Sequence, residues 1–114
     1  MYFNWLPESI LERKIVRSDY YEIIWEIEDA LTIMDLAIQR DVLILGGDML
    51  DEDFQFNYAN WYYNPSADLT CKENVVQGAE KAKEYLCRYM NRNGKGHYVI
   101  IVEDVKFSHL QHWE

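Results

Sequence analysis

The sequence is poor in cysteine. Only Cys71 and Cys87 occur in 114 residues, and both fall within one predicted helix, where they would lie about 24 Å apart. A disulfide needs Cα atoms within about 7 Å of each other. We therefore expect two reduced thiols in the core rather than an intrachain disulfide.

Basic residues are also scarce. The chain has 11 Lys and Arg against 20 Asp and Glu, which gives a net charge of −9. The excess is confined to residues 22–53, which hold ten carboxylates and a single base, Arg40. Nucleic acids and anionic membranes are bound by basic surface, so both are disfavoured as partners. A basic protein partner, or solubility alone, fits this charge better.

Long apolar runs are missing too. None is long enough to span a bilayer, and the N-terminus lacks the basic segment, apolar core and cleavage site of a secretory leader. These absences predict a cytoplasmic protein. The hydrophobic fraction of 49% and the aromatic fraction of 15% exceed those of disordered chains. Because the length suits one hydrophobic core, we expect a single domain over residues 1–114.

Signatures of catalysis or of cofactor binding are lacking. The segment LGGD has neither the spacing nor the lysine of a phosphate-binding loop. The carboxylates of residues 48–53 do not follow the pattern of a calcium loop, and His109 with His112 has no third ligand nearby. We therefore expect no enzymatic activity, no metal and no cofactor.

Two helices are predicted from apolar side chains at spacings of three and four. The first covers residues 19–40, opened by a capping box of Asp19 and Glu22. A short helix is compatible with residues 8–16, since Pro7 can occupy a first helical turn.

The second helix begins at a capping box of Thr70 and Glu73 and ends before Gly94. Gly78 lies beside its apolar side, where a missing side chain would let helix and sheet approach closely. The segment HYVIIV at residues 97–102 is rich in β-branched side chains and predicts a central strand.

Between the helices lies the segment VLILGGDMLDEDFQFNYANWYYN. Residues 42–45 predict a buried strand, Gly46 and Gly47 a turn, and residues 48–53 an acidic connection. From residue 54 to residue 64 the pattern alternates, as in a half-exposed antiparallel strand. The order helix, strand, strand, helix, strand predicts an α+β fold with two main helices on a small, mostly antiparallel sheet.

The segments ILGGDML and NWYYN resemble the signature of a family of immunity proteins, immunity protein family forty, from bacterial polymorphic-toxin systems. The similarity covers residues 19–103. The family is α+β and its members are encoded beside toxins, so the resemblance implies a non-catalytic inhibitor of a cognate toxin. It supplies no contact residues. The motif residues are expected to shape the glycine turn, with an Asn that caps it and a Trp that packs on it: Gly46, Gly47, Asn60 and Trp61.

Two acidic surfaces are candidates for binding a basic toxin. One is the outer side of the first helix, where Trp25 would stand among carboxylates as an anchor, unless the sheet or the N-terminal segment covers it. The other is the acidic turn, with Tyr62 beside it if Trp61 packs inward. The expected partner-binding residues are Glu22, Trp25, Glu28, Asp29, Asp35, Asp48, Asp51, Glu52, Asp53 and Tyr62.

Two other functions stay open. The same surface could serve a general protein-interaction module whose partner is not a toxin. Less favoured is a small metal-dependent enzyme built on the carboxylates, which are too numerous for any one pair to be a signal.

Overall fold

The computed structural model describes residues 3–17 and 22–104, which form three helices and five strands. The strands make one antiparallel sheet in the order β1-β2-β5-β3-β4. The predicted α+β fold with helices on an antiparallel sheet is therefore confirmed. In chain order the elements are α1 (Glu8–Leu11), β1 (Ile15–Arg17), β2 (Glu22–Glu26), α2 (Ile27–Arg40), β3 (Ile44–Leu50), β4 (Phe56–Tyr62), α3 (Cys71–Asn93) and β5 (Tyr98–Glu103).

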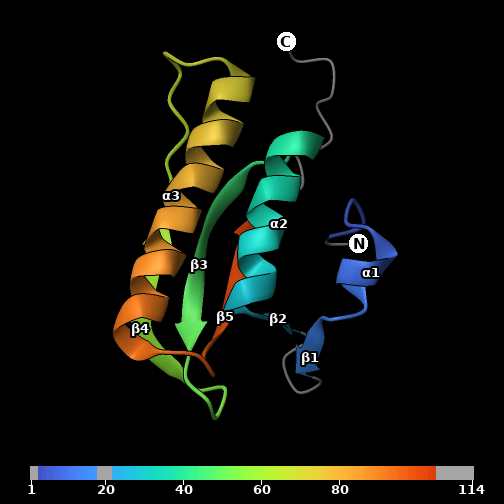
Figure 1. Ribbon diagram of the computed structural model, residues 1–114. Helices are drawn as coiled ribbons and strands as arrows, with labels where there is room; N and C mark the ends of the chain where they lie inside the picture. Colours follow the sequence, from blue (N-terminus) through green and yellow to red (C-terminus); the bar gives the residue numbers. More distant parts are fainter. Residues whose placement is uncertain (1–2, 18–21, 105–114) are drawn as a thin grey trace.

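The two long helices, α2 and α3, lie side by side on one face of the sheet (Figure 1). The main hydrophobic core fills the space between them and the strands. No described helix is long and apolar enough to cross a membrane. The predicted central strand is β5, the third of the five strands.

Helix α3 follows its sequence signals. Thr70 Oγ1 accepts a hydrogen bond from the Glu73 N–H at 3.0 Å, and the Glu73 carboxylate accepts one from the Thr70 N–H at 2.9 Å. The helix ends at Asn93, and Gly94 follows with a φ of 76°. A Cβ at Gly78 would lie 2.9 Å from the Ile44 carbonyl oxygen. The capping box, the helix end and the close approach at Gly78 are all confirmed.

Replacing Thr70 with alanine is expected to lower the free energy of unfolding by about 1 kcal/mol, because the first turn of α3 loses its side-chain cap. Urea unfolding followed by circular dichroism measures this loss. Thr32→Ala on the exposed side of α2 is the matched control and should not destabilise the protein. Equal losses in the two variants would contradict a capping role.

The predicted helix over residues 19–40 is wrong in its first part. Residues 22–26 form β2, and Trp25 pairs with Val99 in the middle of the sheet. Isoleucine and tryptophan suit a buried strand, and a strand of only five residues does not disturb the helical spacing that follows it. Asp19 of the predicted capping box lies outside the described residues, and Glu22 belongs to β2.

The predicted glycine turn is also wrong. Gly46 and Gly47 lie inside β3, and the chain reverses later, where Asp51 Oδ1 accepts hydrogen bonds from the N–H groups of Asp53 and Gln55. The glycines serve packing instead. A Cβ at Gly47 would come within 2.6 Å of Trp61 Cζ3 and 2.8 Å of the Ile100 carbonyl oxygen.

Both cysteines are free and lie in α3, as expected. Their predicted place in the core is wrong, since Cys71 is partly exposed and Cys87 is exposed. The apolar side of α3 is made by other residues, among them Val75 and Leu86.

Candidate functional site

Among the residues that the structure describes, no helix covers the face of the sheet opposite α2 and α3 (Figure 1). Residues paired across an antiparallel sheet share a face. Gly47 pairs with Trp61 and Ile101, which pack toward the helices. The next residue, Asp48, pairs with Asn60 and Ile100, so this row lies on the opposite face.

This uncovered surface, which we call the open face, is aromatic and carries one carboxylate. Tyr58 is 94% exposed, Tyr62 65% and Val102 44%. Asp48 lies between them on β3 and is partly exposed. Exposed aromatic side chains around a charge are typical of protein-binding surfaces. The open face consists of Gly46, Asp48, Tyr58, Asn60, Tyr62, Ile100 and Val102.

Tyr58 has an unusual backbone. Its φ of 67° lies in the left-handed region, which costs a non-glycine residue about 1–2 kcal/mol. It sits in a β-bulge, because the register between β3 and β4 shifts between Asp48 and Leu50. Bulges redirect side chains and are frequent beside functional sites. Here the bulge holds a tyrosine almost entirely in solvent.

The acidic turn between β3 and β4 adjoins one end of the open face. Asp51 is used to close the turn, whereas Glu52 and Asp53 are exposed. Within residues 3–17 and 22–104, neither Glu52 nor Asp53 forms an ion pair, and the same holds for Asp48. These three carboxylates therefore carry negative charge that no described side chain neutralises.

The orientation of Tyr62 is confirmed, but its predicted place beside the acidic turn is wrong. Trp61 packs inward with 6% exposure, and Tyr62 points outward. Tyr62 pairs with Gly46, near the start of β3, whereas the turn follows the end of that strand. The aromatic residue of the open face nearer the turn is Tyr58, which was not among the expected partner-binding residues.

The acidic side of α2 is largely neutralised by bases from elsewhere in the fold. Lys83 Nζ lies 2.6 Å from Asp35 Oδ1, and this hydrogen bond raises the pKa of Lys83. Lys95 Nζ lies 3.8 Å from Glu28 Oε2. Because opposite charges face each other here, this surface attracts a basic partner less than the sequence suggested.

Three other expected partner residues are engaged inside the protein. Trp25 is fully buried and its ring contacts Phe3, so its predicted role as an exposed anchor is wrong. Asp29 is 8% exposed and accepts a hydrogen bond from Arg13 Nε at 2.7 Å. Glu22 is bound by a base of the neighbouring strand β1, with 3.0 Å between nitrogen and oxygen.

The motif residues also divide between the two faces. Trp61 packs on Gly47, as a structural role requires, although that glycine is in a strand. Asn60 is exposed on the open face opposite Asp48. Its predicted side-chain cap of a glycine turn is wrong, because the turn itself is elsewhere.

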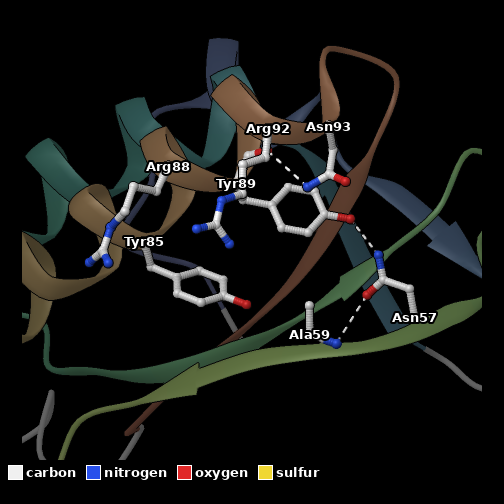
Figure 2. A pocket seen from close by; sticks show the side chains of 7 residues that line it. All are labelled: Asn57, Ala59, Tyr85, Arg88, Tyr89, Arg92 and Asn93. Carbon is white, nitrogen blue, oxygen red and sulfur yellow. Dashed lines mark hydrogen bonds between the residues drawn. The ribbon is translucent and has the colours of Figure 1, made fainter.

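A pocket of about 460 Å³ lies between α3 and β4, at the edge of the sheet (Figure 2). Figure 2 shows Tyr85 and Tyr89 projecting from α3 toward β4, with Arg88 and Arg92 on the same helix. Asn57 Nδ2 donates a hydrogen bond to the Tyr89 hydroxyl. Nothing in the sequence pattern singled out this pocket, since its residues come from two elements 30 positions apart. It is lined by Asn57, Ala59, Tyr85, Arg88, Tyr89, Arg92 and Asn93.

An aromatic row runs under α3 along this pocket. The rings of Trp61 and Tyr85 are 5.2 Å apart, those of Tyr85 and Tyr89 6.5 Å, and those of Tyr89 and His97 5.4 Å. Burial raises the pKa of Tyr85. These ring contacts fix the positions of the aromatic side chains that α3 and β4 contribute to the pocket.

Among the described residues, no cluster of three or more His, Cys, Asp or Glu side chains could hold a metal ion. His109 and His112 lie outside the described residues.

Comparison with known proteins gives one match. A protein-family model described as Immunity protein 40 matches residues 14–103, from the start of β1 to the end of β5. No curated protein and no solved structure matches the chain.

Proposed function

The chain belongs to the Immunity protein 40 family, and from this premise we propose that it binds and neutralises a cognate bacterial toxin. Neutralisation is by non-catalytic protein–protein contact in the cytoplasm of the producing cell. The family match over residues 14–103 is the observation that carries this proposal. The match indicates the class of function but names no contact residues. The contact surface is therefore inferred from the exposure and charge of the side chains in this structure.

The proposed toxin-binding surface is the open face together with the tip of the acidic turn. Its support is the combination of exposed aromatic rings and unneutralised carboxylates within one connected region. Tyr58 is the proposed anchor, because large aromatic side chains contribute most to binding energy. Asp48, Glu52 and Asp53 are the proposed charged contacts, facing a basic surface of the toxin.

This surface differs from the one expected from the sequence. The carboxylates Glu22, Glu28 and Asp35 are engaged in ion pairs, so a toxin would have to compete with bases of this chain for them. The carboxylates of Asp48, Glu52 and Asp53 form no ion pair with a described side chain, so a toxin could bind them without displacing a base of this chain. Their negative potential also speeds association with a basic partner, and the effect weakens as salt rises.

The test is affinity for the product of the neighbouring gene after charge reversal at the tip. Glu52→Lys with Asp53→Lys should weaken binding by about tenfold and flatten its salt dependence, since both removed charges face the partner. Isothermal titration calorimetry at two salt concentrations measures both quantities. Glu28→Lys with Asp35→Lys is the matched control, because it changes the net charge equally on α2.

The two double variants separate the two acidic surfaces. The proposal requires that the tip variant lose more affinity than the α2 variant. A larger loss in the α2 variant would place the toxin on the helices instead. If the neighbouring gene product binds neither the variants nor the parent protein, the immunity function itself is refuted for that partner.

A further inference from the structure

We propose that the groove between α3 and β4 is a second binding site, which takes an extended acidic segment of a protein. The site lies at the β4 edge of the sheet, on the side of α3, and it meets the open face at Asn60 and Tyr62. Its cations belong to α3, outside the proposed toxin-binding surface, and the proposal stands whether or not the partner is a toxin.

The groove is longer than the pocket of Figure 2. A second hollow adjoins the first, and Tyr85 lines both. The second hollow runs along Asn60 to Asn64 of the chain and reaches Lys81 on α3. From Lys81 to Arg92 the helix rises about 16 Å, a length that about five residues of extended chain would span.

The walls of the groove are basic although the protein is acidic. Lys81, Arg88 and Arg92 line it, and no carboxylate does. Arg88 is paired with Glu84 at 2.6 Å. Within the part of the chain that the structure describes, Lys81 and Arg92 form no ion pair. On a chain of net charge −9, this is a local positive site that complements a negatively charged ligand.

The spacing of these cations suits a peptide in the extended conformation. Arg88 and Arg92 are one helical turn apart, about 6 Å along the axis. Side chains at alternate positions of an extended chain point the same way and are about 6.6 Å apart. Of two acidic residues separated by one residue, one would therefore meet Arg92 and the other would compete with Glu84 for Arg88. Guanidinium binds carboxylate strongly.

The edge of the sheet offers backbone pairing beside these charges. β4 is the last strand of the sheet and pairs only with β3 among the described strands. The Tyr63 N–H donates to the Leu45 carbonyl at 2.7 Å, so the alternation of an antiparallel ladder turns the backbone groups of Asn60 and Tyr62 to the free edge. A strand added there would gain main-chain hydrogen bonds.

The bulge limits where such a strand can lie. The Ala59 N–H donates to Asn57 Oδ1 at 3.1 Å and is not free for a partner. The backbone groups at the free edge, those of Asn60 and Tyr62, follow this bulge and lie next to Lys81 and Tyr85. Chemistry and geometry together favour a protein segment over a free phosphate or a nucleic acid, because only a peptide uses both the cations and the strand edge.

A fluorescent peptide that alternates glutamate with threonine is the probe, measured by anisotropy with the full chain. The parent protein should bind it saturably and less tightly at higher salt. Arg88→Gln with Arg92→Gln should weaken binding at least about tenfold, or about 1.4 kcal/mol. The control Lys14→Gln with Arg40→Gln removes the same charge from exposed positions outside the groove and should bind as the parent does.

Other outcomes would overturn the proposal. These are no saturable binding, equal losses in the groove and control variants, or competition by inorganic phosphate or single-stranded DNA at lower concentration than by unlabelled peptide. Urea unfolding of each variant verifies that it is folded. A proline at the central position of the peptide should weaken binding further if the strand edge takes part, because proline removes a backbone donor.

Discussion

Replacing Gly47 with alanine is expected to lower the free energy of unfolding by about 3 kcal/mol, a typical cost of overpacking a well-filled site. The added methyl group would meet the ring of Trp61 and the Ile100 carbonyl oxygen, which lies 2.8 Å from the Cβ position. Trp61 is itself held by stacking on Tyr85. The cost arises because neither the strand backbone nor the ring can move freely. Urea unfolding measures it.

A double-mutant cycle tests the cause of this loss. Trp61→Phe shortens the side chain that the new methyl group would touch. In that background Gly47→Ala should cost at least 1 kcal/mol less, by the size of couplings between contacting residues. Equal costs in both backgrounds would mean that Gly47 is needed for some reason other than contact with Trp61.

The second large effect concerns binding. Tyr58→Gly is expected to weaken affinity for the neighbouring gene product about 30-fold, or about 2 kcal/mol, which is the scale of an interface hot spot. The side chain is 94% exposed and its φ is 67°. Glycine accepts this φ without strain. Unfolding free energy should therefore stay within about 1 kcal/mol of the parent value.

Val16→Ala is the control for this variant. Val16 is a half-exposed apolar residue of β1, 52% exposed, at the other edge of the sheet from β4. Its loss should leave affinity unchanged. If Tyr58→Gly binds as tightly as the parent, the open face is not the contact surface, whatever the control shows.

The parts of the fold that could be predicted from sequence are those set by neighbouring residues. Helix α3 carries its own cap at Thr70, its own apolar stripe and its own end at Gly94, so the whole element was foreseeable. The central place of β5 followed from its β-branched run. Each of these signals acts within a few residues of chain and needs no knowledge of the rest of the fold.

The missed features depend on contacts between distant residues. Trp25 belongs to a strand because it pairs with Val99. The residues next to Trp25 in the sequence do not indicate that pairing. Gly47 suggested a turn because glycine permits one, whereas its role is to leave room for Trp61, 14 positions later. A glycine in the sequence does not reveal whether backbone freedom or space is what the fold requires.

The structure moves the candidate binding surface from α2 to the open face and the acidic turn, because ion pairs neutralise the carboxylates of α2. The sequence places the acidic excess in residues 22–53, but the fold brings Lys83 and Lys95 to the carboxylates of α2. What remains unneutralised is the row from Asp48 to the turn tip. The identity of the family could be inferred from two short motifs, yet two of those motif residues, Gly47 and Trp61, pack against each other on the helix side of the sheet rather than on the open face.

Hydrogen exchange of the full chain, with and without the neighbouring gene product, tests most directly that the open face and the acidic turn bind the toxin. Binding should slow amide exchange in residues 51–63, while the exchange of α2 residues 27–40 stays as it is in the free protein. Slower exchange on α2, with residues 51–63 unaffected, would contradict the proposed surface.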